Sequence, residues 1–172
     1  MLIVLKDGLK IFYVGIIMSK IKIRVIDCHI AYYNKQKSTW EFLLIKRSKN
    51  TIYGETWQGV TGKIENSEIP YKAALRELEE ETGLSALKLW TIDKVNTFYD
   101  AERDIMNLIP VFGVTVNSKK VLLSKEHIEY KWCTINQTVK LITWDQQKKG
   151  VKIFHDMLCE NKKRLKFMEI KI

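Results

Sequence analysis

Residues 62–84 of the chain read GKIENSEIPYKAALRELEEETGL, from Gly62 to Leu84. The stretch predicts a glycine loop followed by a short acidic helix. Pro70 suits the first helical turn, where its missing N–H costs little, and Gly83 suits the left-handed position that ends a helix. These two residues therefore predict where the helix begins and ends.

Three glutamates gather on one side of the predicted helix. At about 100° per residue, Glu77, Glu80 and Glu81 fall within an arc of roughly 100°. Neighbouring carboxylates repel each other, by on the order of 3 kcal/mol per pair at about 5 Å and an effective dielectric of about 20, before solvent screening. A divalent cation among them turns this repulsion into attraction, and hard carboxylate oxygens suit Mg²⁺, with Mn²⁺ as a substitute. The helix therefore predicts a metal site.

The same stretch resembles the Nudix box, Gly-x5-Glu-x7-Arg-Glu-U-x-Glu-Glu-x-Gly-U, in which U is an aliphatic residue. All nine fixed positions of that motif are filled here: Gly62, Glu68, Arg76, Glu77, Leu78, Glu80, Glu81, Gly83 and Leu84. A solvated acidic helix would explain the glutamates, but not the glycine loop, the arginine and the terminating glycine at these offsets. The resemblance implies a Nudix-type α/β/α sandwich and an enzyme that hydrolyses a nucleoside diphosphate linked to another moiety.

The resemblance also implies a role for each polar position of the motif. The implied metal ligands are three carboxylates and one carbonyl oxygen, those of Glu77, Glu80, Glu81 and Gly62. Arg76 would orient the catalytic glutamates through a salt bridge, Glu68 would hold the loop against the helix, and Glu79 would face solvent. The acceptor of the proton from the attacking water stays open among three carboxylates: Glu77, Glu80 and the downstream Glu126.

Flanking residues narrow the resemblance to one branch. Trp57-Gln58-Gly-Val-Thr61 precedes the motif, and Glu126-His127-x-x-Tyr130-Lys131-Trp132 follows it. These segments are similar to the dATP and dihydroneopterin triphosphate pyrophosphohydrolase branch, which cleaves a triphosphate to a monophosphate and pyrophosphate. We expect Lys46 or Arg47 to hold the phosphates. The candidates for contact with the base or pterin are Trp57, Gln58 and Tyr99.

Three other functions stay open. Tyr99 lies 16 residues beyond Gly83, a placement similar to that of a tyrosine in diadenosine polyphosphate hydrolases, so dinucleoside polyphosphates are an alternative substrate class. Capped or 5′-triphosphate RNA is a second alternative because the chain is basic. A non-catalytic nucleotide-sensing Nudix module is the third, although such modules commonly show a degraded motif and every carboxylate of the motif is present here.

The charge of the chain is unevenly distributed. The formal net charge is +9, with eight lysines and arginines against three acidic residues in 148–172, and three against six in 62–84. This distribution suits an enzyme that attracts polyphosphates and also holds a cation. We therefore expect a small nucleotide or pterin polyphosphate as the partner. Nucleic acid stays open as a partner, but no basic motif interleaved with aromatic residues supports it. A homodimer stays open as the assembly.

Length and cysteine content favour one domain in a reducing compartment. A chain of 172 residues fits a single domain with a sizeable core. The three cysteines are widely spaced and odd in number, which indicates the cytoplasm. We expect one Nudix domain at 18–172, and a non-native extension at 1–17 ahead of a biological start at Met18. The apolar run 11–18 is too short to span a bilayer.

The remaining pattern predicts strands and helices around the motif. Strands are expected at 21–33, 40–47, 87–99, 105–116 and 129–134, helices at 137–145 and 149–161, and a strand or frayed tail at 166–172. Pro110 is expected near a bulge or an edge. Strands that embrace two or more helices make the predicted fold class α+β, with a mixed β-sheet.

Overall fold

The computed structural model describes residues 20–160 and 162–172, so the predicted extension at 1–17 and the start at Met18 lie outside the described residues. The strands are β1 (Lys20–Lys22), β2 (Val25–Asn34), β3 (Thr39–Arg47), β4 (Trp57–Gln58), β5 (Val60–Lys63), β6 (Lys88–Asp100), β7 (Ile105–Thr115), β8 (His127–Cys133) and β9 (Glu169–Ile170). The helices are α1 (Pro70–Thr82), α2 (Ile135–Leu141), α3 (Asp145–Glu160) and α4 (Lys162–Met168). Within the described ranges, no helix is long and apolar enough to cross a membrane.

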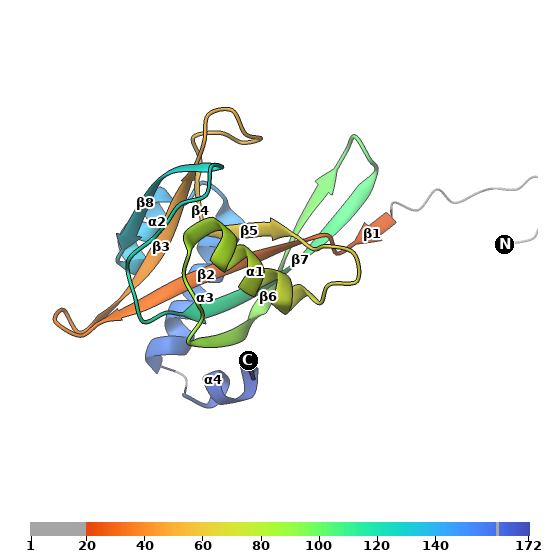
Figure 1. The fold of residues 1–172 in the computed structure, drawn as a ribbon. Coiled ribbons are helices and arrows are strands. Elements are labelled where there is room, and N and C mark those ends of the chain that lie inside the picture. Colours follow the sequence, from red (N-terminus) through yellow and green to blue (C-terminus); the bar gives the residue numbers. More distant parts are fainter. Residues whose placement is uncertain (1–19, 161) are drawn as a thin grey trace, which may run out of the picture.

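The strands form one mixed sheet in the order β4-β3-β2-β7-β6-β9. β2 pairs in parallel with β7 and antiparallel with β3 and β5, while β8 pairs with the outer part of β3. Figure 1 shows α1 on one face of this sheet and α3 on the other. Helices on both faces of a mixed sheet confirm the predicted α+β sandwich.

Side-chain alternation along β2 divides the core between the two faces. Ile26 and Ile30 pack in one buried cluster with Leu78 of α1. Ala31, on the other face, packs in a second cluster with Phe154 of α3. Because successive strand residues point to opposite faces, one strand supplies both clusters. This packing fixes α1 over β2 and β5, where the glycine loop enters the helix.

The amino-terminal strand is divided where the sequence predicted one continuous strand at 21–33. β1 pairs in parallel with β7, and β2 begins at Val25. The two helices near the carboxyl end begin earlier than predicted. α2 begins at Ile135 because Thr134 and Gln137 form a capping box ahead of it, a pattern that supplies partners for the first free N–H groups.

The carboxyl terminus differs most from the prediction. The strand or frayed tail expected at 166–172 is confirmed only in part, since α4 continues to Met168 and a short strand, Glu169–Ile170, then pairs with β6. Leu165 and Met168 lie three residues apart, on one side of a helix, and pack against the core cluster beneath α3. The local sequence is basic, but the helical conformation lets these two apolar side chains pack against the core.

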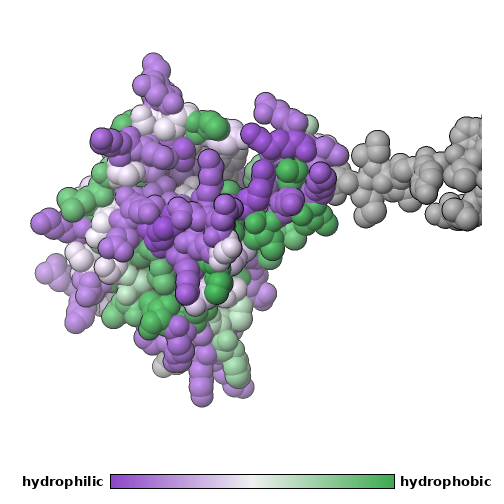
Figure 2. All heavy atoms as spheres, turned by 45° about the vertical axis from the view of Figure 1, so that its right-hand side comes forward, coloured by the Kyte–Doolittle hydropathy of each residue, from purple (hydrophilic) through white to green (hydrophobic). Residues whose placement is uncertain are grey.

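The β6–β7 hairpin projects from the body of the molecule (Figure 1). Pro110 pairs with Val95 at the point where the register between the two strands shifts, which confirms the expected bulge. Figure 2 shows hydrophobic side chains at this end of the molecule, where Ile21, Ile23 and Tyr99 are each more than half exposed.

Candidate active site

Both predicted boundaries of the acidic helix are confirmed. Pro70 occupies the start of α1. Gly83 follows the helix with φ of 66°, in the left-handed region that favours glycine, and its N–H donates to the Glu79 carbonyl oxygen at 2.8 Å. The chain therefore leaves the helix sharply after the last carboxylate of the motif.

A distant loop completes the carboxyl end of α1. The Leu122 N–H donates to the Thr82 carbonyl oxygen at 2.8 Å, and the Ser124 N–H donates to the Glu81 carbonyl oxygen at 3.2 Å. Helix-terminal carbonyls need such partners because no further helical turn supplies them. These bonds attach the loop that carries Glu126 to the end of α1, at Glu81 and the residue that follows it.

Arg76 connects the glycine loop to the helix. Its guanidinium donates to both oxygens of Glu68 at 3.0 and 2.9 Å, and to the Lys63 carbonyl oxygen at 2.8 Å. It also donates to Glu77 Oε1 at 2.9 Å and to Glu80 Oε2 at 3.0 Å. The hydrogen bonds that Arg76 donates to Glu68 are the main reason why the pKa of Arg76 is raised. This geometry suits the roles that the resemblance implied for Arg76 and Glu68.

Glu77 lies tightly against the glycine loop. A Cβ atom at Gly62 would overlap the Glu77 carboxyl group, so only glycine permits this approach. Burial raises the pKa of Glu77, and the hydrogen bond from Arg76 acts in the opposite direction. A surface hollow of about 540 Å³ lies beside the glycine loop and α1. It is lined by Lys63, Ile64, Glu65, Asn66, Arg76 and Glu77.

Glu81 is the most buried carboxylate of the motif. Its side chain is 8% exposed, and burial followed by the Glu77 charge raises its pKa well above the ordinary value, while Arg47 opposes the shift. Oε1 lies 3.8 Å from His127 Nε2. Among the described residues, Oε2 has no hydrogen-bond partner. A buried carboxylate in this state favours any cation that can reach it.

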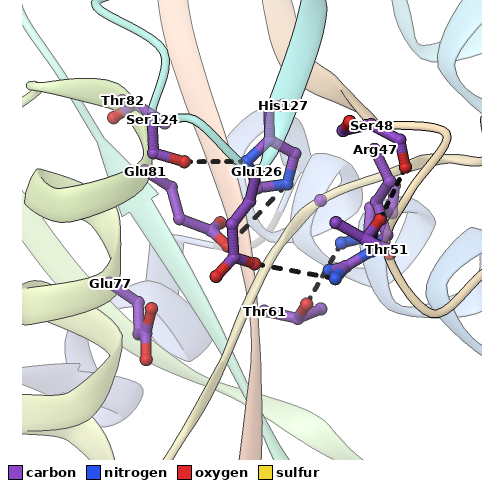
Figure 3. Close-up of polar contacts among 12 residues, drawn as sticks. Arg47, Ser48, Thr51, Thr61, Glu77, Glu81, Thr82, Ser124, Glu126 and His127 are labelled. Atoms are coloured by element: carbon purple, nitrogen blue, oxygen red, sulfur yellow. Dashed lines mark hydrogen bonds and ion pairs between the residues drawn. The ribbon is translucent and has the colours of Figure 1, made fainter. Parts of the chain in front are cut away.

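Arg47 and Glu126 meet beside Glu81 (Figure 3). Arg47 Nη2 lies 3.6 Å from Glu126 Oε2, and Arg47 Nε donates to the Ile52 carbonyl oxygen at 2.9 Å. The Ser48 N–H donates to the Glu126 carbonyl oxygen at 2.8 Å. Glu126 nevertheless remains 64% exposed. The end of β3 thus supplies a fixed cation, and the distant loop supplies an accessible carboxylate.

The carboxylates are not gathered into a ready cation cage. In the part of the chain that the structure describes, no three histidine, cysteine, aspartate or glutamate side chains form a metal-ligating group. Glu77 and Glu80 turn toward Arg76, whereas Glu81 turns toward His127. The donors still fit a hard divalent cation, because they are carboxylate oxygens on adjoining turns and Glu81 Oε2 lacks a partner.

Four of the five predicted substrate contacts come together at the adjoining ends of β3 and β4. They are Lys46, Arg47, Trp57 and Gln58. Lys131 Nζ lies 4.6 Å from the centre of the half-buried Trp57 ring. Gln58 is buried, and its Nε2 donates to Thr61 Oγ1 at 3.1 Å. The Trp57 ring packs in the cluster on the α3 face of the sheet, whereas Arg47 meets Glu126 beside Glu81 of α1.

Tyr99 is placed elsewhere. It lies on β6, three positions along the sheet from β3, in the projecting hairpin. Its side chain is 51% exposed, and its hydroxyl donates to Asp104 Oδ1 at 2.8 Å. The structure therefore does not bring Tyr99 to the other four predicted contacts.

A buried polar cluster on the α3 face of the sheet was not predicted. Asp27 accepts hydrogen bonds from Asn96 Nδ2 at 2.8 Å and from Gln147 Nε2 at 3.1 Å, and the Gly59 N–H lies 3.4 Å from Gln147 Oε1. Burial raises the pKa of Asp27 to about 7. The cluster joins β2, β6 and α3 to the segment before the glycine loop. Its signal in the sequence is one carboxylate within a largely apolar strand, β2.

Comparisons with known proteins agree with this geometry. The NUDIX domain family matches residues 24–153. The rat bis(5′-nucleosyl)-tetraphosphatase (asymmetrical) is 27% identical over 125 residues, which cover 71% of this chain and 83% of the relative. A solved C. elegans Ap4A hydrolase complex has a TM-score of 0.67 at 20% identity, and covers 80% of this chain and 98% of that one. The E. coli dihydroneopterin triphosphate pyrophosphohydrolase has a TM-score of 0.59 at 19% identity, over 78% and 98% of the two chains. At these identities the two solved structures show a shared fold, while the family match covers most of the chain: the chain belongs to the NUDIX domain family.

Proposed function

We propose that this Nudix hydrolase cleaves a phosphoanhydride bond of a nucleotide polyphosphate, with Mg²⁺ as cofactor and Mn²⁺ as a substitute. The observation that carries the proposal is Glu81, a buried carboxylate with one oxygen lacking a partner within the described chain, between Glu77 and the Arg47–Glu126 pair. Nudix hydrolases generally use divalent metals, and these donors fit one.

The motif residues divide the work of holding the cation and shaping its surroundings. The carboxylates of Glu77, Glu80 and Glu81, with the Gly62 carbonyl oxygen, would hold the metal. When bound, the metal supplies a more acidic water and neutralises phosphate charge. Arg76 is a positioning residue, since its hydrogen bonds orient the carboxylates of Glu77 and Glu80. Removing it would free both side chains.

Glu126 is the proton acceptor that the geometry favours. Glu77 and Glu80 each accept a hydrogen bond from Arg76 within 3.0 Å, which occupies one oxygen of each carboxylate. Glu126 is 64% exposed and contacts Arg47 at the longer distance of 3.6 Å. When a phosphate takes the place of Glu126 at Arg47, the released carboxylate can accept a proton from water. Arg47 is then the phosphate contact, with Lys46 beside it.

Dinucleoside tetraphosphates are the first substrate class to test. The support is the rat asymmetrical tetraphosphatase, of which this chain covers 83% at 27% identity. A nucleoside or pterin triphosphate is the second class, because Trp57 and Gln58 offer one aromatic and one amide contact on the strand pair β3–β4, which also carries Lys46 and Arg47. Tyr99 lies too far along the sheet to join that contact. The three free cysteines support a cytoplasmic location for either activity.

The test is a substrate panel with product analysis. Diadenosine tetraphosphate, dATP, dihydroneopterin triphosphate and 5′-triphosphate RNA are each incubated with the protein and Mg²⁺, Mn²⁺ or EDTA. Asymmetric cleavage to ATP and AMP supports the first class, whereas pyrophosphate release from a triphosphate supports the second. Glu77→Gln is expected to lower kcat by at least about 100-fold. Glu79→Gln is the matched control, because Glu79 is an exposed residue of the same helix. Tight nucleotide binding with no metal-dependent turnover of any substrate would overturn the enzymatic proposal.

A further inference from the structure

His127 is held in a fixed position at the start of β8. Its side chain is 0% exposed. Its backbone N–H donates to the Ser124 carbonyl oxygen at 3.2 Å, and its ring Nδ1 lies 3.2 Å from Ser124 Oγ. The Ser124 N–H in turn donates to the Glu81 carbonyl oxygen at 3.2 Å. One short turn therefore fixes both the backbone and the ring of His127 relative to the last turn of α1.

The other ring nitrogen faces the motif carboxylate. His127 Nε2 lies 3.8 Å from Glu81 Oε1, and Figure 3 shows the ring directed at that carboxylate. Over residues 20–160 and 162–172, neither His127 Nε2 nor Glu81 Oε2 has a hydrogen-bond partner. Buried polar atoms without partners are uncommon in folded proteins, so two of them side by side call for an explanation.

The contact with Ser124 allows a proton on Nε2, because the hydroxyl can donate to Nδ1. A neutral imidazole carries one N–H, on either Nδ1 or Nε2. When the Ser124 hydroxyl donates to Nδ1, the ring proton resides on Nε2 and is directed at Glu81 Oε1. When Glu81 is ionised to bind a cation, the opposite tautomer would direct a lone pair at its carboxylate, which is repulsive.

We propose that His127 is a positioning residue for Glu81: its Nε2–H holds Oε1 and leaves Oε2 as the oxygen that binds a divalent cation. Ser124 acts one step further out by fixing the His127 tautomer. The inference rests on the proposed metal role of Glu81. Metal-binding side chains commonly need such partners, and their loss typically costs 10–100-fold in metal affinity or activity.

Two amide variants separate the two ring nitrogens. In His127→Gln the amide nitrogen reaches the place of Nε2, so a donor to Glu81 remains. In His127→Asn the shorter amide reaches only the place of Nδ1, so the donor to Glu81 is lost. Glu79→Gln, on the exposed side of α1, is the control. Each protein is measured without substrate for Mn²⁺ affinity by electron paramagnetic resonance, and then for kcat, KM and melting temperature.

His127→Asn is expected to lower Mn²⁺ affinity and kcat by about 10–100-fold, with KM changed by less than about threefold. His127→Gln should keep both within about threefold of the unaltered protein. Equal Mn²⁺ affinities in the two variants would overturn the proposal, whether both stay normal or both fall together with the melting temperature. A normal His127→Gln and a weakened His127→Asn support it even if no substrate of the panel is cleaved, which would be a failure of the proposed function alone.

Nitrogen-15 NMR of the Mg²⁺-containing protein gives a readout that needs no turnover. The expected signals of His127 are those of the Nε2–H tautomer. In Ser124→Ala they should move toward those of a mixture of the Nε2–H and Nδ1–H tautomers. An Nδ1–H tautomer in the unaltered protein would overturn the inference. If the unaltered protein binds no Mn²⁺, the metal assignment of the proposed function fails, and the inference, which rests on it, fails as well.

Discussion

Replacing Arg76 with methionine removes the link between the glycine loop and α1 while keeping a side chain of similar length. Arg76 donates to two largely buried carboxylates, Glu68 and Glu77, at 2.9–3.0 Å. Hydrogen bonds to charged groups contribute about 1.5–3 kcal/mol each, and the partial exposure of the guanidinium reduces this. We expect Arg76→Met to lower the free energy of unfolding by about 2–3 kcal/mol. For a domain of this size, the melting temperature should fall by roughly 4–12 °C.

The assay is denaturant and thermal unfolding followed by circular dichroism, with kcat measured on the best substrate of the panel. The matched control is Arg103→Met, because Arg103 forms one ion pair with Asp100 and is 61% exposed. Such a pair contributes less than about 1 kcal/mol. We expect kcat of Arg76→Met to fall by about 10–100-fold, since Glu77 and Glu80 lose their orienting partner. Equal stabilities and equal activities of the two variants would refute the reasoning.

Three further substitutions test separate contacts. Gly62→Ala introduces a Cβ that overlaps the Glu77 carboxyl group, so kcat should fall by about 100-fold; an unchanged kcat would show that Glu77 can move freely. Because folding raises the pKa of Asp27 from 3.8 to about 7, the folded protein keeps a proton that the unfolded chain has lost between those values, and stability falls as pH rises through that window. Asp27→Asn should flatten this decline in urea titrations from pH 4 to 8, and an unaltered slope would contradict the assignment. Glu126→Gln should lower kcat by about 10²–10⁴-fold if Glu126 accepts the proton, whereas a near-normal kcat would remove it from that role.

The local part of the site could be predicted because its signals are local. Pro70 and Gly83 define the ends of α1 through backbone preferences that operate within one helical turn. The offsets of Arg76 and Glu68 likewise place them on one helix and the loop just before it. The main strands of the mixed sheet followed from segments that alternate or run apolar, whereas the division of 21–33 and the short strands β4 and β5 were not predicted.

The contacts that were missed join distant parts of the chain. The hydrogen bonds of Asp27 reach Asn96 and Gln147, 69 and 120 residues away, so no spacing in the sequence indicates them. The sequence did not predict the approach of His127 to Glu81, because that contact depends on how β8 pairs with β3. The helix at the carboxyl end was missed for a similar reason. Its two apolar side chains gain burial only against a core that the local sequence does not contain.

The central claim is that the glutamates near the carboxyl end of α1 bind a divalent cation, and that the enzyme uses this cation to cleave a phosphoanhydride bond. The most direct measurement is metal-dependent kcat of Glu81→Gln, with Glu79→Gln as its neighbour on the same helix. The glutamine amide has nearly the same size as the Glu81 carboxyl group and carries no charge that must be buried. Glu81→Gln should therefore be at least as stable as the unaltered protein. The account predicts that kcat falls by at least about 100-fold in Glu81→Gln and by less than about threefold in Glu79→Gln. Equal, undiminished turnover by the two variants would contradict it.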